Sequence, residues 1–344
     1  LSDARHDRVS SGVPARTATR HPGALLMTQA KGDVCYGFEI FGRRHLTLPV
    51  RSGTGTPLTL SQTGEPPKVS GPPVLEIRSP EGVPFARIHR SGGALAAWIS
   101  DAGWFEIDPV RRSISLPSGP DKALLEARLW AVPIAMCMLE RGDLPLHAAA
   151  VDIGGSALVL AAPTFHGKTT LAAGFVRRGF RVLSEDVTCV SAGGVPSVLP
   201  GPAFLRLRRH THMNLSIPGA TVVAEEGAGG RVYVAMDGSQ RGTGDPVPLA
   251  GILLIRPTAG GFRLEPVARA DAMPDLWALA LNQPTRDGFS ECFLRLSRLI
   301  DLVPVWNLHR PSGLHLLDDV VERLANLFGG MSQEEPSVAT PITA

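Results

Sequence analysis

The stretch Ala-Pro-Thr-Phe-His-Gly-Lys-Thr at residues 162–169 constrains the fold of this chain more than any other. A short apolar segment of strand type, residues 156–161, precedes it. Residues 169–178 follow, with apolar side chains spaced for one face of a helix, and Gly179 comes where a left-handed residue commonly ends a helix. Strand, loop and helix in this order are the setting of a phosphate-binding P-loop, so we predict a P-loop here.

The residue types of this loop suit phosphate chemistry. Gly167 allows the backbone to approach a phosphate, Lys168 supplies a cation, and Thr169 supplies a hydroxyl ligand for Mg²⁺. The first position holds Ala162 where the usual motif has glycine, and a chance Gly-Lys-Thr in an ordinary turn is the alternative. We expect ATP and Mg²⁺ as ligands, with the nucleotide held by Ala162, Pro163, Thr164, Phe165, His166, Gly167, Lys168, Thr169 and Thr170.

A pair of acidic residues, Glu185 and Asp186, follows the apolar start of residues 180–187. In open α/β sheets ligands bind at the carboxyl ends of strands, so the pair is expected near the phosphate site. A carboxylate there can bind Mg²⁺ or accept the proton of an attacking hydroxyl. We assign Asp186 to catalysis and to the metal, with Thr169, and give Glu185 a supporting catalytic role; a solvated turn with two acids is the alternative.

The N-terminal third of the chain predicts strands. Residues 1–33 have no periodicity and are expected to be a disordered leader, with Met27 as an internal start. A β-rich domain is expected over 34–120, with an antiparallel sheet and a loop over 52–73, where Pro, Gly, Thr and Ser are dense. Its strands are expected at 36–41, 74–78, 85–88, 95–99, 104–107 and 113–116.

The remaining residues, 121–330, are expected to form the P-loop domain of an α/β protein, followed by a disordered tail over 331–344. A helix over 121–142 is expected to bend at Pro133, and a β-hairpin over 148–161 to lead into the P-loop. A strand at 202–208 and a hairpin or loop over 219–246 should lie near the site. Further strands are expected at 249–255 and 303–308, and helices at 271–281, 288–300 and 314–328.

Composition excludes several classes of protein. The formal net charge is +2, from 34 basic and 32 acidic residues, so no nucleic-acid partner is expected. Four widely spaced cysteines have neither metal-site spacing nor the density of a disulfide framework, and reduced thiols fit a cytoplasmic protein. The longest apolar stretch, residues 129–139, is too short to span a bilayer, and no signal peptide is visible, so no membrane partner is expected.

Residues 144–190 resemble the HPr serine kinase superfamily. The resemblance rests on Leu-His-Ala at 146–148, the P-loop, Arg-Gly-Phe-Arg at 178–181, and Leu-Ser-Glu-Asp-Val at 183–187. The wider arrangement is similar to HPr-kinase-related proteins of natural-product clusters, including the lasso peptide kinases. The resemblance implies a P-loop core like that of HPr kinase and PEP carboxykinase. It also implies phosphate and Mg²⁺ roles for Lys168 and Thr169, and active-site roles for Asp186 and His147, the latter with a satisfied core histidine as the alternative.

Two departures from that family matter. The first acid of the pair is Glu185 where the family has Asp, and the Glu-containing signature of true HPr kinases has no match around residues 201–209, which argues against HPr as the substrate. We expect an ATP-dependent kinase that phosphorylates a hydroxyl, in a peptide serine or a small natural product. The alternatives are a nucleotide-binding regulatory protein without phosphotransfer, and an ATPase or phosphorylase. The family's habit of assembly suggests a homo-oligomer. The candidates for an arginine that neutralises developing charge are Arg206, Arg208, Arg241 and Arg286.

Overall fold

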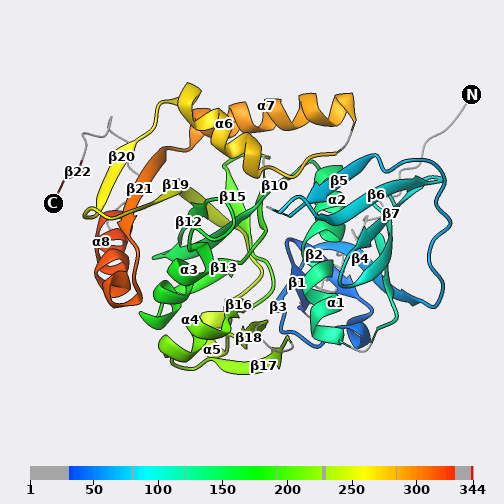
Figure 1. Cartoon of the computed structure of the whole chain (residues 1–344), viewed down its shortest axis with the longest axis horizontal. Coiled ribbons are helices and arrows are strands. Elements are labelled where there is room, and N and C mark those ends of the chain that lie inside the picture. The colour runs from blue at the N-terminus through cyan, green and yellow to red at the C-terminus, as the bar shows by residue number, and fades with distance from the viewer. Residues whose placement is uncertain are drawn as a thin grey trace, which may run out of the picture. The chain divides into compact units, whose positions relative to one another are not determined.

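The computed structural model describes residues 31–79, 81–119, 121–191, 193–226, 230–283, 285–329 and 342–343. Most of the expected leader and nearly all of the expected tail, Met27 included, lie outside these residues. Two large sheets and one small sheet account for the strands, and helices flank them (Figure 1).

The first sheet is built from the N-terminal third of the chain and has nine strands in the order β3-β1-β2-β4-β9-β8-β7-β6-β5. Strands β5 to β9 form an antiparallel meander, which confirms the predicted antiparallel sheet, while β4 pairs parallel to both β2 and β9. The strands are β1 (Gly32–Cys35), β2 (Phe38–Phe41), β3 (Arg51–Gly53), β4 (Thr56–Thr63), β5 (Leu75–Arg78), β6 (Pro84–Ser91), β7 (Ala94–Ile99), β8 (Gly103–Asp108) and β9 (Ser113–Pro117), with a short 3₁₀ helix η1 (Arg43–His45).

The predicted loop over 52–73 is wrong in its first half, because β4 occupies Thr56–Thr63. Leu58 and Leu60 are buried on one face while their neighbours face solvent, which is the alternation of a half-buried strand. Turn-forming residues on both sides obscure these two apolar positions in the sequence. The strand predicted at 36–41 begins two residues later in the structure, at Phe38, because Tyr36 and Gly37 form a turn with positive φ.

Two helices, α1 (Lys122–Leu129) and α2 (Val132–Arg141), replace the single bent helix predicted over 121–142. Pro133 lies in the first turn of α2, where its missing N–H group is not needed, so the chain breaks before the proline. Both helices pack into the hydrophobic core of the N-terminal sheet. The predicted domain boundary between residues 120 and 121 would therefore separate α1 and α2 from the sheet whose core they share.

The second sheet has ten strands, with the central order β15-β19-β12-β11-β13 and β21 pairing with β19. Its strands are β10 (Leu144–Leu146), β11 (Ala148–Ile153), β12 (Ser156–Ala161), β13 (Arg181–Ser184), β14 (Thr188–Ser191), β15 (Ser197–Leu199), β19 (Val247–Thr258), β20 (Arg263–Pro266), β21 (Val305–Pro311) and β22 (Ile342–Thr343). Strands β11 and β12 form the predicted hairpin. Strands β12, β19 and β21 are parallel, and β13 runs in the same direction as β12 because both are antiparallel to β11. Their carboxyl ends therefore meet at one edge of the sheet.

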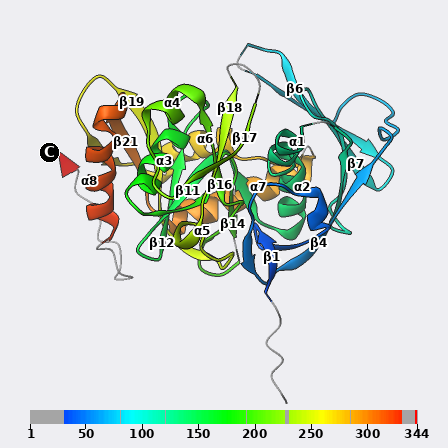
Figure 2. The same cartoon turned by 90° about the horizontal axis from the view of Figure 1, so that it is seen from below.

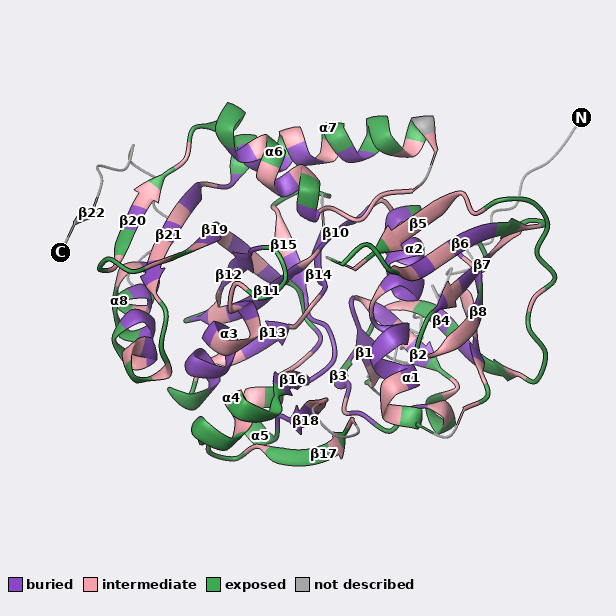
Figure 3. Cartoon of the chain, in the orientation of Figure 1, coloured by how far each residue is buried: buried purple, intermediate pink, exposed green. Residues whose placement is uncertain are grey.

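Alternating side chains of this sheet bury against helices on its two faces. Val151, Leu158 and Leu160 pack toward α3 (Lys168–Arg177) and α8 (Leu317–Gly329). Ala150 and Val159 pack toward α6 (Arg269–Leu279) and α7 (Arg286–Leu302). The central strands are accordingly buried on both faces, while α7 exposes its outer surface (Figure 3). The result is a three-layered α/β arrangement.

A small three-stranded sheet lies beside this core (Figure 2). It consists of β16 (Phe204–Arg208), β18 (Arg231–Ala235) and β17 (Thr221–Glu225), with α4 (Arg209–Asn214) and α5 (Gly238–Arg241). This confirms the strand predicted at 202–208 and resolves the segment over 219–246 into a hairpin and a short helix. A second 3₁₀ helix, η2 (Leu314–Leu316), precedes α8. Within the described residues, no helix has the length and apolar character needed to cross a membrane. All four cysteines are free and buried.

Glu126 joins α1 to the loop before β3. Its carboxylate accepts hydrogen bonds from the backbone N–H groups of Thr47 at 2.6 Å and of Leu48 at 2.8 Å. Glu126→Ala leaves the buried Leu48 N–H group without an acceptor, so we expect a loss of about 1–3 kcal/mol in the free energy of unfolding, measured in urea. Glu140→Ala, on the exposed side of α2, is the control and should change it by less than about 0.5 kcal/mol. Equal losses in the two variants would contradict this role of Glu126.

Candidate functional site

The loop over 162–167 connects β12 to α3, so strand, loop and helix follow in the predicted order. Gly167 has φ 86° and ψ 22° and directly precedes α3. The guanidinium group of Arg310, at the end of β21, fills the space where a Cβ atom on residue 167 would lie. The backbone conformation therefore favours glycine here, and a Cβ atom would also require the end of the Arg310 side chain to move. At the other end, Gly179 has φ 88° directly after Arg178, the C-cap residue of α3, as predicted.

Lys168 is the first residue of α3, and its side chain folds back beneath the loop. Its ammonium group donates to the carbonyl of Ala162 at 2.6 Å and to that of Pro163 at 3.2 Å. Only 7% of the residue is exposed, and burial lowers the pKa of the amine, whereas the nearby carboxylates of Asp186 and Glu185 oppose that shift. The lysine thus carries its charge into a nearly closed part of the site.

His147, between β10 and β11, links this lysine to the acidic pair. Its Nε2 atom lies 3.1 Å from the Lys168 ammonium, and its Nδ1 atom lies 3.0 Å from the Asp186 carbonyl oxygen. An ammonium group can only donate, so Nε2 is the acceptor and Nδ1 carries the proton. Burial lowers the pKa of the imidazole despite the nearby Asp186 carboxylate, which favours this neutral form.

Glu185 contacts the start of α3. The Thr169 hydroxyl donates to Glu185 Oε1 at 2.6 Å. Burial, reinforced by the adjacent Asp186 charge, raises the pKa of the Glu185 carboxyl to about 7, although Arg206 and the Thr169 hydrogen bond act in the opposite direction. The structure therefore brings Thr169 to Glu185. Asp186, which the sequence predicted to bind a metal together with Thr169, faces His147 and Arg206 instead.

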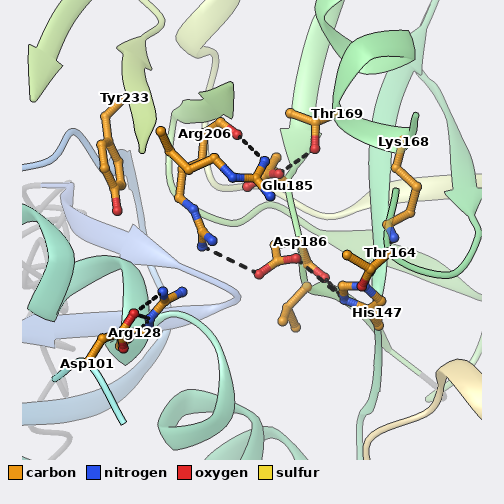
Figure 4. Close-up of polar contacts among 12 residues, drawn as sticks. Asp101, Arg128, His147, Thr164, Lys168, Thr169, Glu185, Asp186, Arg206 and Tyr233 are labelled. Atoms are coloured by element: carbon orange, nitrogen blue, oxygen red, sulfur yellow. Dashed lines mark hydrogen bonds and ion pairs between the residues drawn. The ribbon is translucent and has the colours of Figure 1, made fainter. Parts of the chain in front are cut away.

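Asp186 follows β13 in a left-handed conformation with φ 66°, which is unusual for a residue other than glycine. Its side chain is 38% exposed, with Oδ1 3.5 Å from His147 Nδ1 and Oδ2 3.8 Å from Arg206 Nη1 (Figure 4). Burial disfavours ionisation, but Arg206, His147 and Lys168 together hold the pKa of the carboxyl below its usual value. The group is thus an accessible carboxylate at the sheet edge where ligands bind.

The small sheet supplies an arginine cluster that faces the acidic pair. Arg206 of β16 also approaches Glu226, with its Nε atom 3.6 Å from Oε1. Arg231 of β18 donates to the Arg206 carbonyl at 3.3 Å, and the Tyr233 hydroxyl donates to Glu226 at 2.8 Å. Sequence reasoning named Arg206 but missed Arg231, Glu226 and Tyr233. The alternation in Arg-Val-Tyr-Val at 231–234 places Arg231 and Tyr233 on one face of a strand, and this was the available signal.

The other three predicted arginines differ in position. Arg208 stacks over the ring of Phe165, with its guanidinium carbon 4.3 Å from the ring centroid. Arg241 lies on α5 and donates to the Met236 carbonyl at 3.3 Å, away from the cavities described below. The side chain of Arg286 lies outside the described part of the structure. Of the three candidates whose side chains are described, Arg206 and Arg208 reach the site.

The remaining loop residues lie at the surface of the site. Phe165 is 65% exposed and has a positive φ of 72°. The exposed ring of His166 approaches the Thr164 carbonyl through Nδ1 at 3.0 Å. Thr164 Oγ1 in turn lies 3.4 Å from His147 Nε2, and Thr170 faces the smaller of two cavities. These contacts form an open loop whose backbone is available to a ligand.

Two cavities meet at the acidic pair. The smaller, about 380 Å³, lies beside α3 and α4, and the larger, about 960 Å³, extends between the loop over 162–167 and the N-terminal sheet. Six residues line both of them: His147, Thr164, Phe165, Asp186, Arg206 and Arg231. Lys168, Thr169 and Glu185 line only the smaller, whereas Pro163 and Ala162 line only the larger. The Asp186 carboxylate therefore stands at the boundary between a polar cavity and a wider, mostly apolar one.

The residues available to a metal ion are few. Among the residues that the structure describes, no group of three or more His, Cys, Asp or Glu side chains could hold a metal ion. Thr169 and Glu185 nevertheless bring a hydroxyl and a carboxylate oxygen together, and oxygen ligands are those that Mg²⁺ prefers. Because Mg²⁺ commonly keeps several waters and takes phosphate ligands, this donor set fits an ion that arrives with a nucleotide.

Comparison with known proteins finds similarity in structure alone. No protein-family model matches the chain, and no curated protein matches it in sequence. The solved structure of the HPr(Ser) kinase/phosphatase from Coxiella burnetii is similar, with 10% sequence identity and a TM-score of 0.27. The match covers 54% of this chain and 99% of that protein.

Gly167→Ala tests the close packing of the loop. The substituted residue would suffer left-handed backbone strain of about 1–2 kcal/mol and would also collide with Arg310. Gly155→Ala is the matched control, because Gly155 also has a positive φ of 90° but has no atom within 4 Å of the added Cβ. We expect Gly167→Ala to lower the midpoint of thermal unfolding further than Gly155→Ala does, because only residue 167 must displace Arg310. Equal shifts in the two variants would contradict the packing role.

Proposed function

We propose that this protein is an ATP-dependent kinase that transfers the γ-phosphoryl group to a hydroxyl, of a serine in a peptide or of a small natural product. The observation that carries the proposal is the position of Asp186, which lines both the smaller and the larger cavity. A general base for this transfer must reach the acceptor hydroxyl at the place where that hydroxyl meets the γ-phosphate, and Asp186 lies where the two cavities join. The sequence resemblance to the HPr serine kinase superfamily supports serine as the acceptor residue.

The smaller cavity suits the phosphates of ATP. Lys168 supplies a cation, and the N-terminus of the ten-residue helix α3 directs backbone N–H groups and its positive dipole toward the cavity. The opposite wall carries Arg208 and Arg231. With Arg206, four cationic side chains and a helix terminus surround one polar cavity, which favours a polyanionic ligand over a neutral one.

Thr169 and Glu185 are the residues that would hold Mg²⁺ together with the phosphates. The ion, when bound, neutralises charge on the phosphate oxygens. The Thr169–Glu185 hydrogen bond of 2.6 Å shows that the two oxygens already converge. On this assignment Glu185 takes the metal role, and Asp186 is left to act on the acceptor.

The proposed step is a direct transfer. The acceptor hydroxyl oxygen forms a bond to the γ-phosphorus, and the bond from that phosphorus to the β–γ bridging oxygen breaks, so that ADP leaves with the electron pair. Asp186 takes the hydroxyl proton, and Arg206 compensates the charge that remains on the transferred group. His147 orients Asp186 through the backbone carbonyl and holds Lys168 in place.

Asp186→Asn separates catalysis from binding. The amide cannot take the proton of the acceptor, so we expect ATP binding to be retained and kcat to fall by about 10²–10⁴-fold. Asp245→Asn, at an exposed position outside both cavities, is the matched control. Phosphorylated product is measured by mass spectrometry with a panel of serine peptides and small hydroxyl compounds. Full turnover by Asp186→Asn would refute the assigned role.

Lys168→Ala tests the donor site. Loss of the buried ammonium group should abolish nucleotide-dependent transfer, and Lys122→Ala, on the exposed start of α1, should leave it intact. ATP binding without any phosphorylated product across the panel would favour a nucleotide-binding regulatory protein. Release of free phosphate without an acceptor would favour an ATPase.

A further inference from the structure

The larger cavity joins the P-loop core to the free edge of the N-terminal sheet. Its wall includes Leu75 and Ile77 of β5 and Phe85 of β6, and, from the core, Ala280 and Leu281 in the segment between α6 and α7. Its volume of about 960 Å³ is at the upper end of what ligand pockets span. The cavity reaches Asp186 at its inner end. An acceptor that fills it would therefore contact the N-terminal sheet and Asp186 together.

Strand β5 is the last strand of the nine-stranded sheet, and within the described residues it pairs with β6 alone. Its other edge has no partner strand. Leu75 and Ile77 are half-buried, so β5 combines an unpaired edge with apolar side chains facing a cavity. An unpaired, partly apolar edge is a template on which an extended peptide can add as a further strand.

The facing wall is also extended backbone. The Leu281 N–H group donates to the Pro145 carbonyl at 3.0 Å, and Ala280 forms an antiparallel bridge with Leu146 of β10. The His147 N–H group donates to the Leu279 carbonyl at 2.7 Å, which ties this wall to the residue that orients Asp186. The cavity is thus bounded on two sides by extended chain, a shape that suits an extended peptide.

The charges on the wall favour an acidic acceptor. Arg128 is almost fully buried, pairs with Asp101 and lies over the ring of Phe85, and Arg256 pairs with Asp275. The wall as a whole carries two aspartates, Asp186 and Asp275, and five arginines: Arg78, Arg128, Arg206, Arg231 and Arg256. Arg78 and Arg206 also pair with Glu76 and Glu226, whereas Arg231 makes no ion pair with any described residue and donates to the Arg206 carbonyl. Its guanidinium group favours an acidic side chain beside the hydroxyl residue and disfavours a basic one.

We infer that the acceptor is an extended peptide that adds to the free edge of β5 and presents a hydroxyl side chain, flanked by apolar and acidic residues, to Asp186. The inference rests on the proposed kinase function and names its substrate class and the surface that recognises it. The acceptor oxygen gains the phosphoryl group, ADP leaves, and the proton passes to Asp186, as described above. Backbone pairing with β5 supplies affinity, while Leu75 and Ile77 select the flanking side chains.

Three degenerate peptide libraries with a fixed central serine test the inference. The first has apolar and acidic flanks, the second carries the same flanks with N-methylated backbone amides, and the third replaces the acidic residues with lysine. Phosphate incorporation is read by mass spectrometry, with N-acetylserinamide as a small acceptor. We expect the first library to be phosphorylated at least tenfold faster than the other two, because N-methylation removes the donors of a strand pair and lysine opposes the arginines.

Ile77→Glu and Leu75→Glu test the surface on the protein side. Each should raise KM for the first library at least tenfold and leave KM for ATP unchanged, because β5 does not line the smaller cavity. Val83→Glu, in the same β5–β6 hairpin but 61% exposed and outside the cavity, is the matched control. Thermal unfolding of each variant separates a binding effect from misfolding, and two independent positions on β5 keep the test valid if one variant fails to fold.

The outcomes distinguish this inference from the function on which it rests. Equal rates for the plain and N-methylated libraries, or unchanged KM in a folded β5 variant, would refute strand addition. Phosphorylation of N-acetylserinamide or other small hydroxyl compounds but of no peptide would refute the peptide acceptor and leave the kinase function standing. Bound ATP with no phosphorylated product of any kind would refute both.

Discussion

The buried ammonium group of Lys168 is the charge that the rest of the site balances. A cation removed from water is costly unless acceptors and opposite charges surround it. It donates hydrogen bonds to the carbonyls of Ala162 and Pro163 and to the imidazole of His147. The acidic pair after β13 offsets its charge. Because these groups come from the ends of different strands, the lysine can be accommodated only when the sheet is assembled in its observed order.

The N-terminal sheet holds that assembly in place from the other side. The fully buried side chain of Arg51 donates to the carbonyls of Gly201 and Val182, and the Tyr36 hydroxyl donates to the Val187 carbonyl at 2.9 Å. The acceptors Val182 and Val187 lie on either side of the acidic pair. The same contacts that anchor the N-terminal sheet therefore support the turn that carries Asp186. Under the proposed function, the N-terminal sheet serves both as support for catalysis and as a binding surface for the acceptor.

The two carboxylates of the pair differ because their surroundings differ. Glu185 lies under the start of α3, where burial raises the pKa of its carboxyl to about 7, and Asp186 faces Arg206 and the imidazole of His147, which lower the pKa of its own carboxyl. The chain turns directly after β13, with Asp186 in a left-handed conformation at φ 66°, and this turn places one acid on each side of the site. This geometry permits a division of labour in which Glu185 serves the phosphate side and Asp186 the acceptor side.

The sequence by itself determined the parts of this protein whose signals are local. The order strand, loop and helix around Lys168, the hairpin before it and the left-handed end of α3 at Gly179 follow from turn chemistry and apolar periodicity over a few residues. Only the tertiary structure decided which of Arg206, Arg208 and Arg241 reach the site, that Arg231 joins them, and that β5 forms one wall of the larger cavity. Such contacts join residues far apart in the chain, and their cost in chain entropy is balanced by burial and charge pairing that no short window of sequence contains.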